Sequence, residues 1–145
     1  MVVRDSAASI EAPVVSRVRY FDPAEANRAL IYLRRVTEDI THAYEEVVQL
    51  RLRIESHGHT DTAGILEEAY KRAMVRLSDL VDELQQAGVE LRDFESGTID
   101  FPAISEQGEL FLCWKLGEAA VEHWHDAESP CDQRRPISSL PRLLG

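Results

Sequence analysis

The residues best suited to chemistry are concentrated between residues 99 and 128. This stretch contains both tryptophans of the chain, and it also contains Cys113, His123 and His125. The two histidines are two positions apart, so on a β-strand their imidazoles would point to the same side, as two ligands of a metal ion can. A transition-metal site needs three or four ligands at about 2.0 to 2.3 Å. The spacing therefore permits a site for a divalent transition metal at this end of the chain.

The remaining ligands of such a site would have to come from elsewhere in the same region. The candidates are Asp93, Asp100, Cys113 and Glu118. No CxxC or HExxH motif accompanies the histidines, so the spacing is permissive rather than diagnostic. The competing interpretation, which the sequence favours, is that His125 hydrogen-bonds a backbone or carboxylate group while His123 faces solvent.

A second kind of chemistry would use Cys113 as a nucleophile with His125 as its base. A cysteine between two large apolar residues on a central strand is, however, typically buried and unreactive. Asp93 and Asp100 flank a tight turn, and paired carboxylates can perform acid–base catalysis. Carboxylates beside turns more often hydrogen-bond the turn backbone, and this structural role is favoured.

Glu118 and Arg135 suggest a buried ion pair, either Glu–Arg or Asp–Arg, that holds the C-terminal segment in place. The alternative is that Arg135 binds a small anion or the carboxylate of a ligand. Trp124, like Trp114, could line such a pocket, but a position in the hydrophobic core is favoured for both.

Two long helices precede these residues. The first begins at Asp22-Pro23-Ala24-Glu25, which supplies an N-cap aspartate, a proline at the first helical position and a glutamate three residues after the cap. Apolar residues then keep an a/d heptad pattern to about Ser56, and Gly58 ends the helix. These apolar positions are Ala26, Ala29, Leu33, Val36, Ile40, Ala43, Val47, Leu50 and Ile54.

The second helix follows a short connection, is capped by Thr60 or Asp61, and ends at Gly88. Its apolar positions are Leu66, Tyr70, Ala73, Leu77, Leu80, Leu84 and Ala87. A short loop between two amphipathic helices predicts an antiparallel hairpin over about 22–88. Further apolar residues lie beside both stripes, so the C-terminal region, another subunit or both must pack on the hairpin. We therefore expect a homodimer or a protein partner that contacts the hairpin.

The apolar period changes to two after the second helix, which indicates strands. We predict strands over 89–94, 98–101, 109–115 and 119–125, with Pro102 ending the second. The fold class is α+β: a long antiparallel helical hairpin followed by a small antiparallel β-sheet of three to four strands. The hairpin and the sheet (about 89–126) form a single domain over 20–137, between a mobile N-terminal arm (1–19) and a C-terminal tail (138–145).

Composition excludes several classes of function. The chain has 145 residues and a formal net charge of −10, which argues against binding nucleic acid. No apolar run approaches the roughly 18 residues that span a membrane, and charged residues interrupt the N-terminus where a secretory signal would be apolar. A cytoplasmic location is therefore expected. The two cysteines, Cys113 and Cys131, do not resemble a disulfide framework.

Several short motifs are spread between Phe21 and about Ile137. They are Phe21 with Glu25-Ala26-Asn27, Gly88-Val89, Leu91-Arg92-Asp93, Gly97, Asp100-Phe101-Pro102, Gly108, Leu112-Cys113-Trp114, Leu116-Gly117-Glu118, Trp124-His125 and Arg135-Pro136-Ile137. On these motifs the chain resembles an uncharacterised bacterial family of small proteins, domain of unknown function 2203. The resemblance implies a common fold and no known reaction. The chain departs from the pattern before Arg135, where Ser129-Pro130-Cys131-Asp132 replaces the glycine-rich approach usual in such proteins.

Two functions remain open on the sequence. The favoured hypothesis is a non-enzymatic binding or assembly module that acts through its helical hairpin. The alternative is a metal- or small-ligand-binding protein, or an enzyme, that uses the C-terminal cluster. That cluster comprises Asp100, Cys113, Glu118 and His125, with Arg135 nearby.

Overall fold

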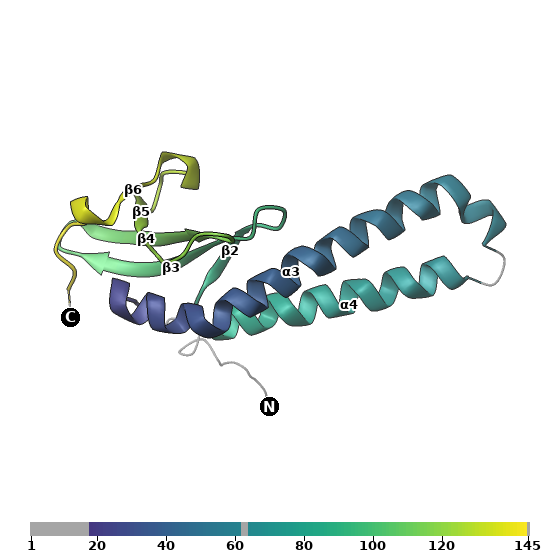
Figure 1. Ribbon diagram of the computed structural model, residues 1–145, viewed down its shortest axis with the longest axis horizontal. Coiled ribbons are helices and arrows are strands. Elements are labelled where there is room, and N and C mark those ends of the chain that lie inside the picture. Colours follow the sequence, from purple (N-terminus) through teal and green to yellow (C-terminus); the bar gives the residue numbers. More distant parts are fainter. Residues whose placement is uncertain (1–17, 62–63, 145) are drawn as a thin grey trace, which may run out of the picture.

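The computed structural model describes residues 18–61 and 64–144, and its elements are labelled as in Figure 1. Helix α3 (Pro23–His57) is followed by the short 3₁₀ helix η1 (Gly58–Thr60) and by α4 (Ile65–Gln86). The strands are β2 (Glu90–Asp93), β3 (Thr98–Ser105), β4 (Gly108–Lys115), β5 (His123–Asp126) and β6 (Arg135–Pro136), with η2 (Cys131–Gln133) before β6 and η3 (Ile137–Ser139) after it. The α+β class is thus confirmed. The predicted N-terminal arm, apart from its last two residues, lies outside the described part.

Aspartate side chains satisfy amides at the start of both helices. The Asp22 carboxylate accepts a hydrogen bond from the Glu25 amide at 2.8 Å, and the Glu25 carboxylate accepts one from the Asp22 amide at 2.9 Å. This reciprocal pair satisfies two amides that have no partner within the helix. At the start of α4, the Asp61 carboxylate accepts from the amides of Ile65 and Leu66 at 2.8 and 2.9 Å. The predicted start of the first helix is therefore confirmed. Helix α4 begins at Ile65, three residues later than a cap at Asp61 would place it, with Gly64 at the N-cap position.

The two helices form an antiparallel hairpin whose far end projects beyond the sheet (Figure 1). The heptad positions predicted from the sequence supply much of its buried interior, including Ala26, Leu33, Val36, Ile40, Ala43, Val47, Leu50, Ala73, Leu77 and Leu84. The sheet packs on the N-terminal part of α3, so part of the surplus apolar surface is covered within the chain itself. No described helix combines the length and the apolar composition that crossing a bilayer requires.

The sheet has five antiparallel strands in the order β2-β3-β4-β5-β6, one more than the most that the sequence predicted. The prediction that Pro102 ends the second strand is wrong, because β3 continues to Ser105 with Pro102 paired to Phe111. The Pro102 carbonyl accepts a hydrogen bond from the Phe21 amide at 2.7 Å. In an antiparallel strand the N–H and C=O of one residue point to the same side, so the amide missing from Pro102 faces away from β4 and costs the ladder no bond.

The last predicted strand is also shorter than expected. The sequence predicts a strand over 119–125, whereas β5 covers His123–Asp126 and residues 116–122 form a turn followed by an irregular loop. The side chain of Asn27 on α3 holds this turn region, because its Oδ1 accepts from the Val121 amide at 2.8 Å. The strand β6, which the sequence did not predict, pairs with β5.

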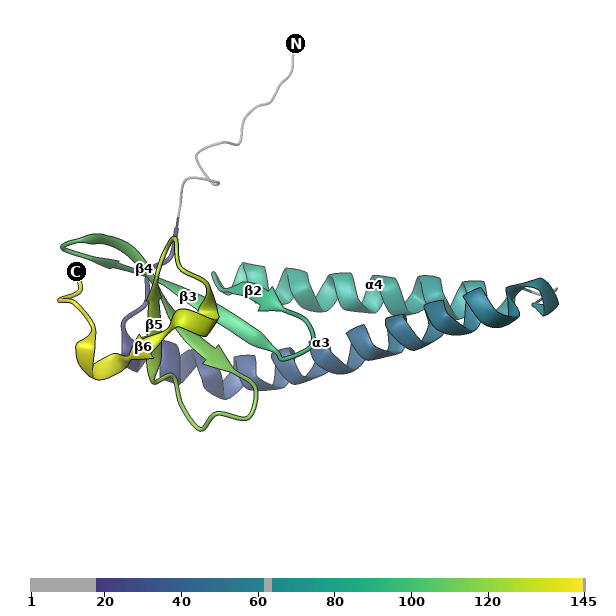
Figure 2. The ribbon, with the colours of Figure 1, turned by 90° about the horizontal axis from the view of Figure 1, so that it is seen from above.

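The two faces of the sheet have different environments. The inner face, which packs against α3, carries buried apolar residues: Ile99, Phe101, Leu112, Trp114 and Trp124. On the outer face, Asp100 lies opposite Cys113, and Cys113 lies opposite His123. The segment after β5 turns back over this outer face, so the molecule has three layers at this end (Figures 1 and 2). Asp100 and Cys113 consequently have no exposed surface although they lie on the polar face.

Candidate metal centre

Four side chains with metal-ligating atoms meet between the outer face and the C-terminal segment. They are Asp100 on β3, Cys113 on β4, His125 on β5 and Cys131 on η2, and their ligand atoms all lie within 4.8 Å of one another. Strand register brings the first three together, since Asp100 pairs with Cys113 and His125 lies two residues beyond the partner of Cys113. The turn that carries η2 then brings Cys131 over the sheet.

The separations between these atoms suit a single ion. The two Sγ atoms are 3.0 Å apart, and Sγ of Cys131 lies 3.4 Å from Nε2 of His125 and 3.3 Å from Oδ1 of Asp100. In a tetrahedral site with bonds of 2.0 to 2.3 Å, neighbouring ligand atoms are about 3.3 to 3.8 Å apart. Shifts of a few tenths of an ångström to about 1 Å would therefore bring all four atoms into coordination distance.

The tautomer of His125 is fixed by the backbone. Its Nδ1 lies 2.8 Å from the carbonyl oxygen of Asp126, which can only accept a hydrogen bond, so Nδ1 carries the proton. In the neutral ring Nε2 then has a free lone pair directed at the other three residues, and metal-binding histidines are commonly oriented in this way. Burial disfavours the charged ring, but the hydrogen bond to Asp100, the charge of Asp100 and the Asp126 carbonyl together outweigh it and raise the pKa of His125 above its ordinary value.

Asp100 is held as a buried anion. Oδ2 accepts hydrogen bonds from Nε of Arg92 at 2.7 Å and from Nε2 of protonated His125 at 2.8 Å. Burial alone would raise the pKa of Asp100, but the hydrogen bonds from His125 and Arg92 outweigh it and lower the pKa below its usual range. Arg92 is itself oriented by Glu90, 2.9 Å away, and by the ring of Phe111, whose centroid is 4.7 Å from the guanidinium carbon.

The two thiols are not equivalent. The hydrogen bond from Cys131 lowers the pKa of Cys113, burial opposes this, and the nearby Arg134 supports it. The pKa of Cys131 is raised, because this thiol shares its hydrogen bond with Cys113, is partly buried and lies beside the negative charge of Asp100. Arg134 lies 3.9 Å from Sγ of Cys113 and is fixed by a two-pronged ion pair with Glu118. Cys113 is therefore the first of the two to become a thiolate.

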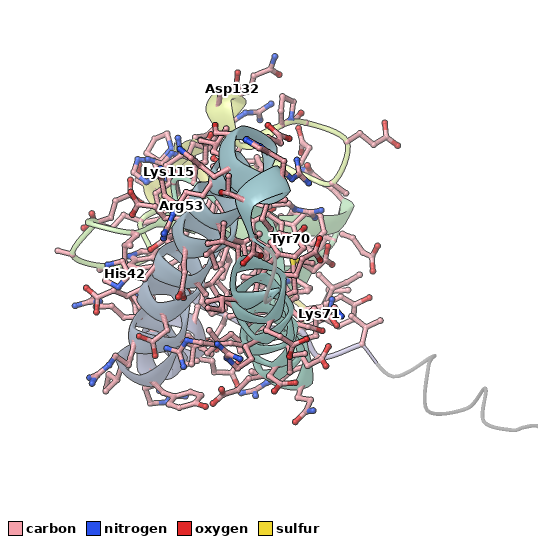
Figure 3. All side chains as sticks on the ribbon, turned by 90° about the vertical axis from the view of Figure 1, so that its right-hand side faces the viewer. His42, Arg53, Tyr70, Lys71, Lys115 and Asp132 are labelled. Carbon is pink, nitrogen blue, oxygen red and sulfur yellow. The ribbon has the colours of Figure 1, made fainter. Side chains whose placement is uncertain are left out.

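A surface cleft of about 720 Å³ leads to this cluster. Asp100, His125 and Cys131 line it, whereas Cys113 does not. Lys115 and Asp132 also line the cleft, and in Figure 3 both lie above His42 of α3. The cluster is therefore buried but has a route to solvent.

The structure brings together three of the residues that the sequence offered as candidates, namely Asp100, Cys113 and His125. It leaves His123 outside the cluster. His123 is half-buried: its Nδ1 is buried and has no hydrogen-bond partner among the described residues, so the expectation that this side chain faces solvent holds only in part. The sequence offered Cys113 as a nucleophile with His125 as its base. In the structure the sulfur that lies 3.4 Å from Nε2 of His125 belongs to Cys131 instead.

The remaining candidates have structural contacts. Asp93 accepts hydrogen bonds from the hydroxyl and amide of Ser96 at 2.6 and 3.3 Å, as the turn interpretation predicted. Trp124 is buried in the core, and its indole nitrogen donates to Ser139 at 3.0 Å.

Arg135 lies on the surface, pairs with Asp126 at 3.2 Å and is not the partner of Glu118. Arg134, one residue earlier, pairs with Glu118, whereas the Asp–Arg pair of Arg135 is exposed rather than buried.

Sequence reasoning missed Cys131 and Arg134. Cys131 stands within Ser129-Pro130-Cys131-Asp132, a segment for which the sequence predicted neither a helix nor a strand. The cysteine itself was the signal that could have found the site. Cysteine is a strong metal ligand, and the absence of apolar periodicity around it gave no packing reason for its presence.

Comparison with known proteins gives one match. No curated protein and no solved structure matches the chain. The family model described as "Uncharacterized conserved protein (DUF2203)" matches residues 19–137, which include both helices, the whole sheet and all four residues of the cluster. Because this match covers most of the chain, the protein belongs to the DUF2203 family of uncharacterized conserved proteins.

Proposed function

We propose that the protein binds a divalent transition metal, zinc above all, through Asp100, Cys113, His125 and Cys131. The observation that carries the proposal is the convergence of these four ligand atoms to within 4.8 Å of one another. They come from four separate elements, three strands and η2, so their proximity does not follow from being close together in the sequence.

The donor set favours zinc over other common ions. Two sulfurs, one imidazole nitrogen and one carboxylate oxygen form a mixed set of soft and borderline ligands. Magnesium and calcium prefer sites made of oxygen ligands, whereas zinc commonly takes four cysteine, histidine or carboxylate ligands in a tetrahedral arrangement.

The residues around the cluster also suit a cation. The Asp126 carbonyl orients His125 with Nε2 directed at the cluster, and Arg92 holds the Asp100 carboxylate. Two thiolates and one carboxylate around a divalent ion would leave one net negative charge, which Arg92 and Arg134 can balance. Such outer contacts fix ligand orientation and raise metal affinity.

Four protein ligands would complete a tetrahedral site and leave no position for a reacting water, as in structural zinc sites. The ion would then tie the C-terminal segment, through Cys131, to the three central strands. We therefore assign the site a non-enzymatic role, in which bound metal stabilises the layer that covers the outer face of the sheet.

The test is a cobalt titration of the full chain after reduction and removal of metal by a chelator. Cobalt substitutes for zinc, and thiolate ligation in tetrahedral geometry gives visible bands and a sulfur-to-metal charge-transfer band. We expect one equivalent to bind, zinc to displace it, and both Cys131→Ser and His125→Ala to lose the spectrum. His42→Ala, at an exposed position on α3, serves as the matched control. Absence of the bands in the wild-type protein, or equal bands in the Cys131→Ser variant, would overturn the proposal.

A second candidate function is assembly through the hairpin, and a specific observation favours it. Three apolar side chains on α3 and α4 are largely exposed, with Ile31 at 83 %, Ile65 at 68 % and Val75 at 61 %. Exposed apolar surface of this kind often marks contacts between proteins. Sedimentation of the wild type beside Val75→Glu tests whether the chain dimerises through α4. A monomer at all concentrations would exclude self-assembly.

A further inference from the structure

Cys113 and Cys131 are nearly close enough to bond to each other. Their sulfur atoms are 3.0 Å apart, and a disulfide bond is about 2.05 Å long, so closure requires a movement of about 1 Å. Cys113 is fixed in the centre of β4, whereas Cys131 belongs to a three-residue 3₁₀ helix between loops. The loop segment is the part of this pair that can supply the movement.

The two sulfurs also differ in access to solvent. Cys113 is completely buried, and Cys131 is partly exposed and lines the cleft. A small oxidant that enters the cleft would therefore meet Cys131 first. Cys113 lies behind it with its sulfur 3.0 Å away and the guanidinium of Arg134 beside that sulfur. Reactive redox cysteines are typically accessible and adjacent to a second cysteine that can resolve the first oxidation product.

We propose that Cys113 and Cys131 form a reversible redox pair, in which Cys131 reacts with a hydroperoxide and Cys113 resolves the product into an intrachain disulfide. In the first step Cys131 passes its proton to the Cys113 thiolate, with which it shares a hydrogen bond, and the Cys131 sulfur attacks the peroxide oxygen. The O–O bond breaks, Cys131 becomes a sulfenic acid, and the alkoxide or hydroxide that leaves takes the proton from Cys113. In the second step the Cys113 thiolate attacks the Cys131 sulfur, the S–S bond forms, and hydroxide leaves and is protonated to water. In total, two thiols and one hydroperoxide give one disulfide, one alcohol or water, and one further water.

The disulfide has a consequence that rests on the proposed metal function. A disulfide sulfur is no longer a thiolate and cannot serve as a zinc ligand, so oxidation would remove two of the four ligands and release the ion. Bound metal would in turn protect both sulfurs from the peroxide. The pair would thereby couple the metal content of the protein to the supply of oxidant.

The disulfide is tested on the reduced, metal-free full chain treated with hydrogen peroxide. Trypsin cuts after Lys115, between the two cysteines, and yields the peptides 93–115 and 116–134. We expect mass spectrometry to find these peptides joined, with the loss of two hydrogens, and to find them separate after dithiothreitol. In Cys113→Ser we expect Cys131 to stop at a sulfenic acid that dimedone traps, and in Cys131→Ser we expect Cys113 to remain unmodified. Separate peptides after peroxide, or links between different chains only, would overturn the proposal.

The coupling to metal is tested by repeating the oxidation on zinc-loaded protein. We expect the linked peptides to form at least tenfold more slowly, and the oxidised protein to give no cobalt spectrum until it is reduced. Cobalt binding by a protein that forms no disulfide overturns the redox pair and leaves the metal site standing. A disulfide in a protein that never binds cobalt overturns the metal function and leaves the redox pair standing.

Discussion

Asp100 and His125 form a buried pair across the sheet, with Nε2 of the ring 2.8 Å from Oδ2 of the carboxylate. The Asp100 side chain is 0 % exposed and the His125 side chain is 3 % exposed. Because Nδ1 donates to the Asp126 carbonyl, Nε2 and Oδ2 would face each other as two acceptors in the neutral ring. A cation must lie between them. A proton fills this role in the metal-free protein, and a metal ion can replace it.

The first prediction concerns the buried charge of Asp100. Asp100→Asn removes the anion that both Arg92 and His125 contact, and we expect the metal-free protein to lose about 2 kcal/mol of unfolding free energy. Urea denaturation measures the change. Asp132→Asn, exposed beside the same cleft, should stay within about 0.5 kcal/mol of the wild type. Equal losses in both variants would contradict the assigned role of Asp100.

The second prediction is that metal stabilises the fold. A ligand that binds only the native state at 100 times its dissociation constant adds about 2.7 kcal/mol to the free energy of unfolding. Zinc should therefore raise the melting temperature of the wild type, and a chelator should reverse the increase. Differential scanning calorimetry measures both, with Cys131→Ser as the comparison. An equal increase in that variant would show that zinc acts elsewhere on the chain.

The third prediction follows from the ion pair of Glu118 with Arg134. Burial opposes ionisation of Glu118, but the hydrogen bonds and charge of Arg134 and the Lys115 amide together outweigh it and lower the pKa of Glu118. A carboxyl group with a lowered native pKa contributes stability above its unfolded value, about 4.3, and loses it as the pH falls through the native value. Glu118→Gln should therefore be less stable than the wild type near pH 6 and approach it near pH 3. Urea denaturation across this range measures the difference, and a constant difference would contradict the prediction.

The fourth prediction concerns the turn between β2 and β3, where Gly97 has a φ of 68°. A Cβ added there would lie 2.9 Å from Cβ of Leu116 and 3.1 Å from Cγ2 of Thr41, so the turn is pressed against both the sheet and α3. Gly97→Ala should combine a left-handed backbone cost of about 1 kcal/mol with an overpacking cost of about 1 to 3 kcal/mol.

Gly64 provides a matched control for this prediction. It also has a φ of 68°, and a Cβ added there would meet nothing within 4 Å. Gly64→Ala should therefore show the backbone cost alone, about 1 kcal/mol. Guanidinium denaturation of the two variants separates the contributions, and equal losses would mean that the close contacts at Gly97 relax without cost.

Much of the architecture was predictable because its determinants are local. Asp22 and Glu25 specify the start of α3 through hydrogen bonds between residues three apart. Heptad spacing in the helices and alternation in β4 determine which side chains face the core. The prediction that Pro102 ends its strand failed because the outcome depends on a contact distant in sequence. The Pro102 carbonyl bonds the Phe21 amide, so the position of the missing Pro102 amide faces Phe21 rather than β4.

The candidate site was predictable only in part. His125, Asp100 and Cys113 were identified by their chemistry, and alternation placed Cys113 on the face opposite the apolar residues of its strand. Which of His123 and His125 joins the cluster depended on where the C-terminal segment crosses the sheet. That crossing also placed Arg134, rather than Arg135, against Glu118. Neighbouring residues in an extended segment point to opposite sides, so a shift of one residue changes the partner.

The sequence by itself determined the helices, the faces of the strands and the presence of ligand-type side chains in the C-terminal half, because these follow from spacing, capping and residue chemistry. Only the tertiary structure decided that Cys131 lies 3.0 Å from Cys113 and 3.4 Å from His125. The physical reason is that the segment after β5 is held by scattered contacts rather than by a periodic pattern. Among these, the Ile137 amide donates to the Glu122 carbonyl and the Leu144 amide to the Ile104 carbonyl, at 2.9 Å each.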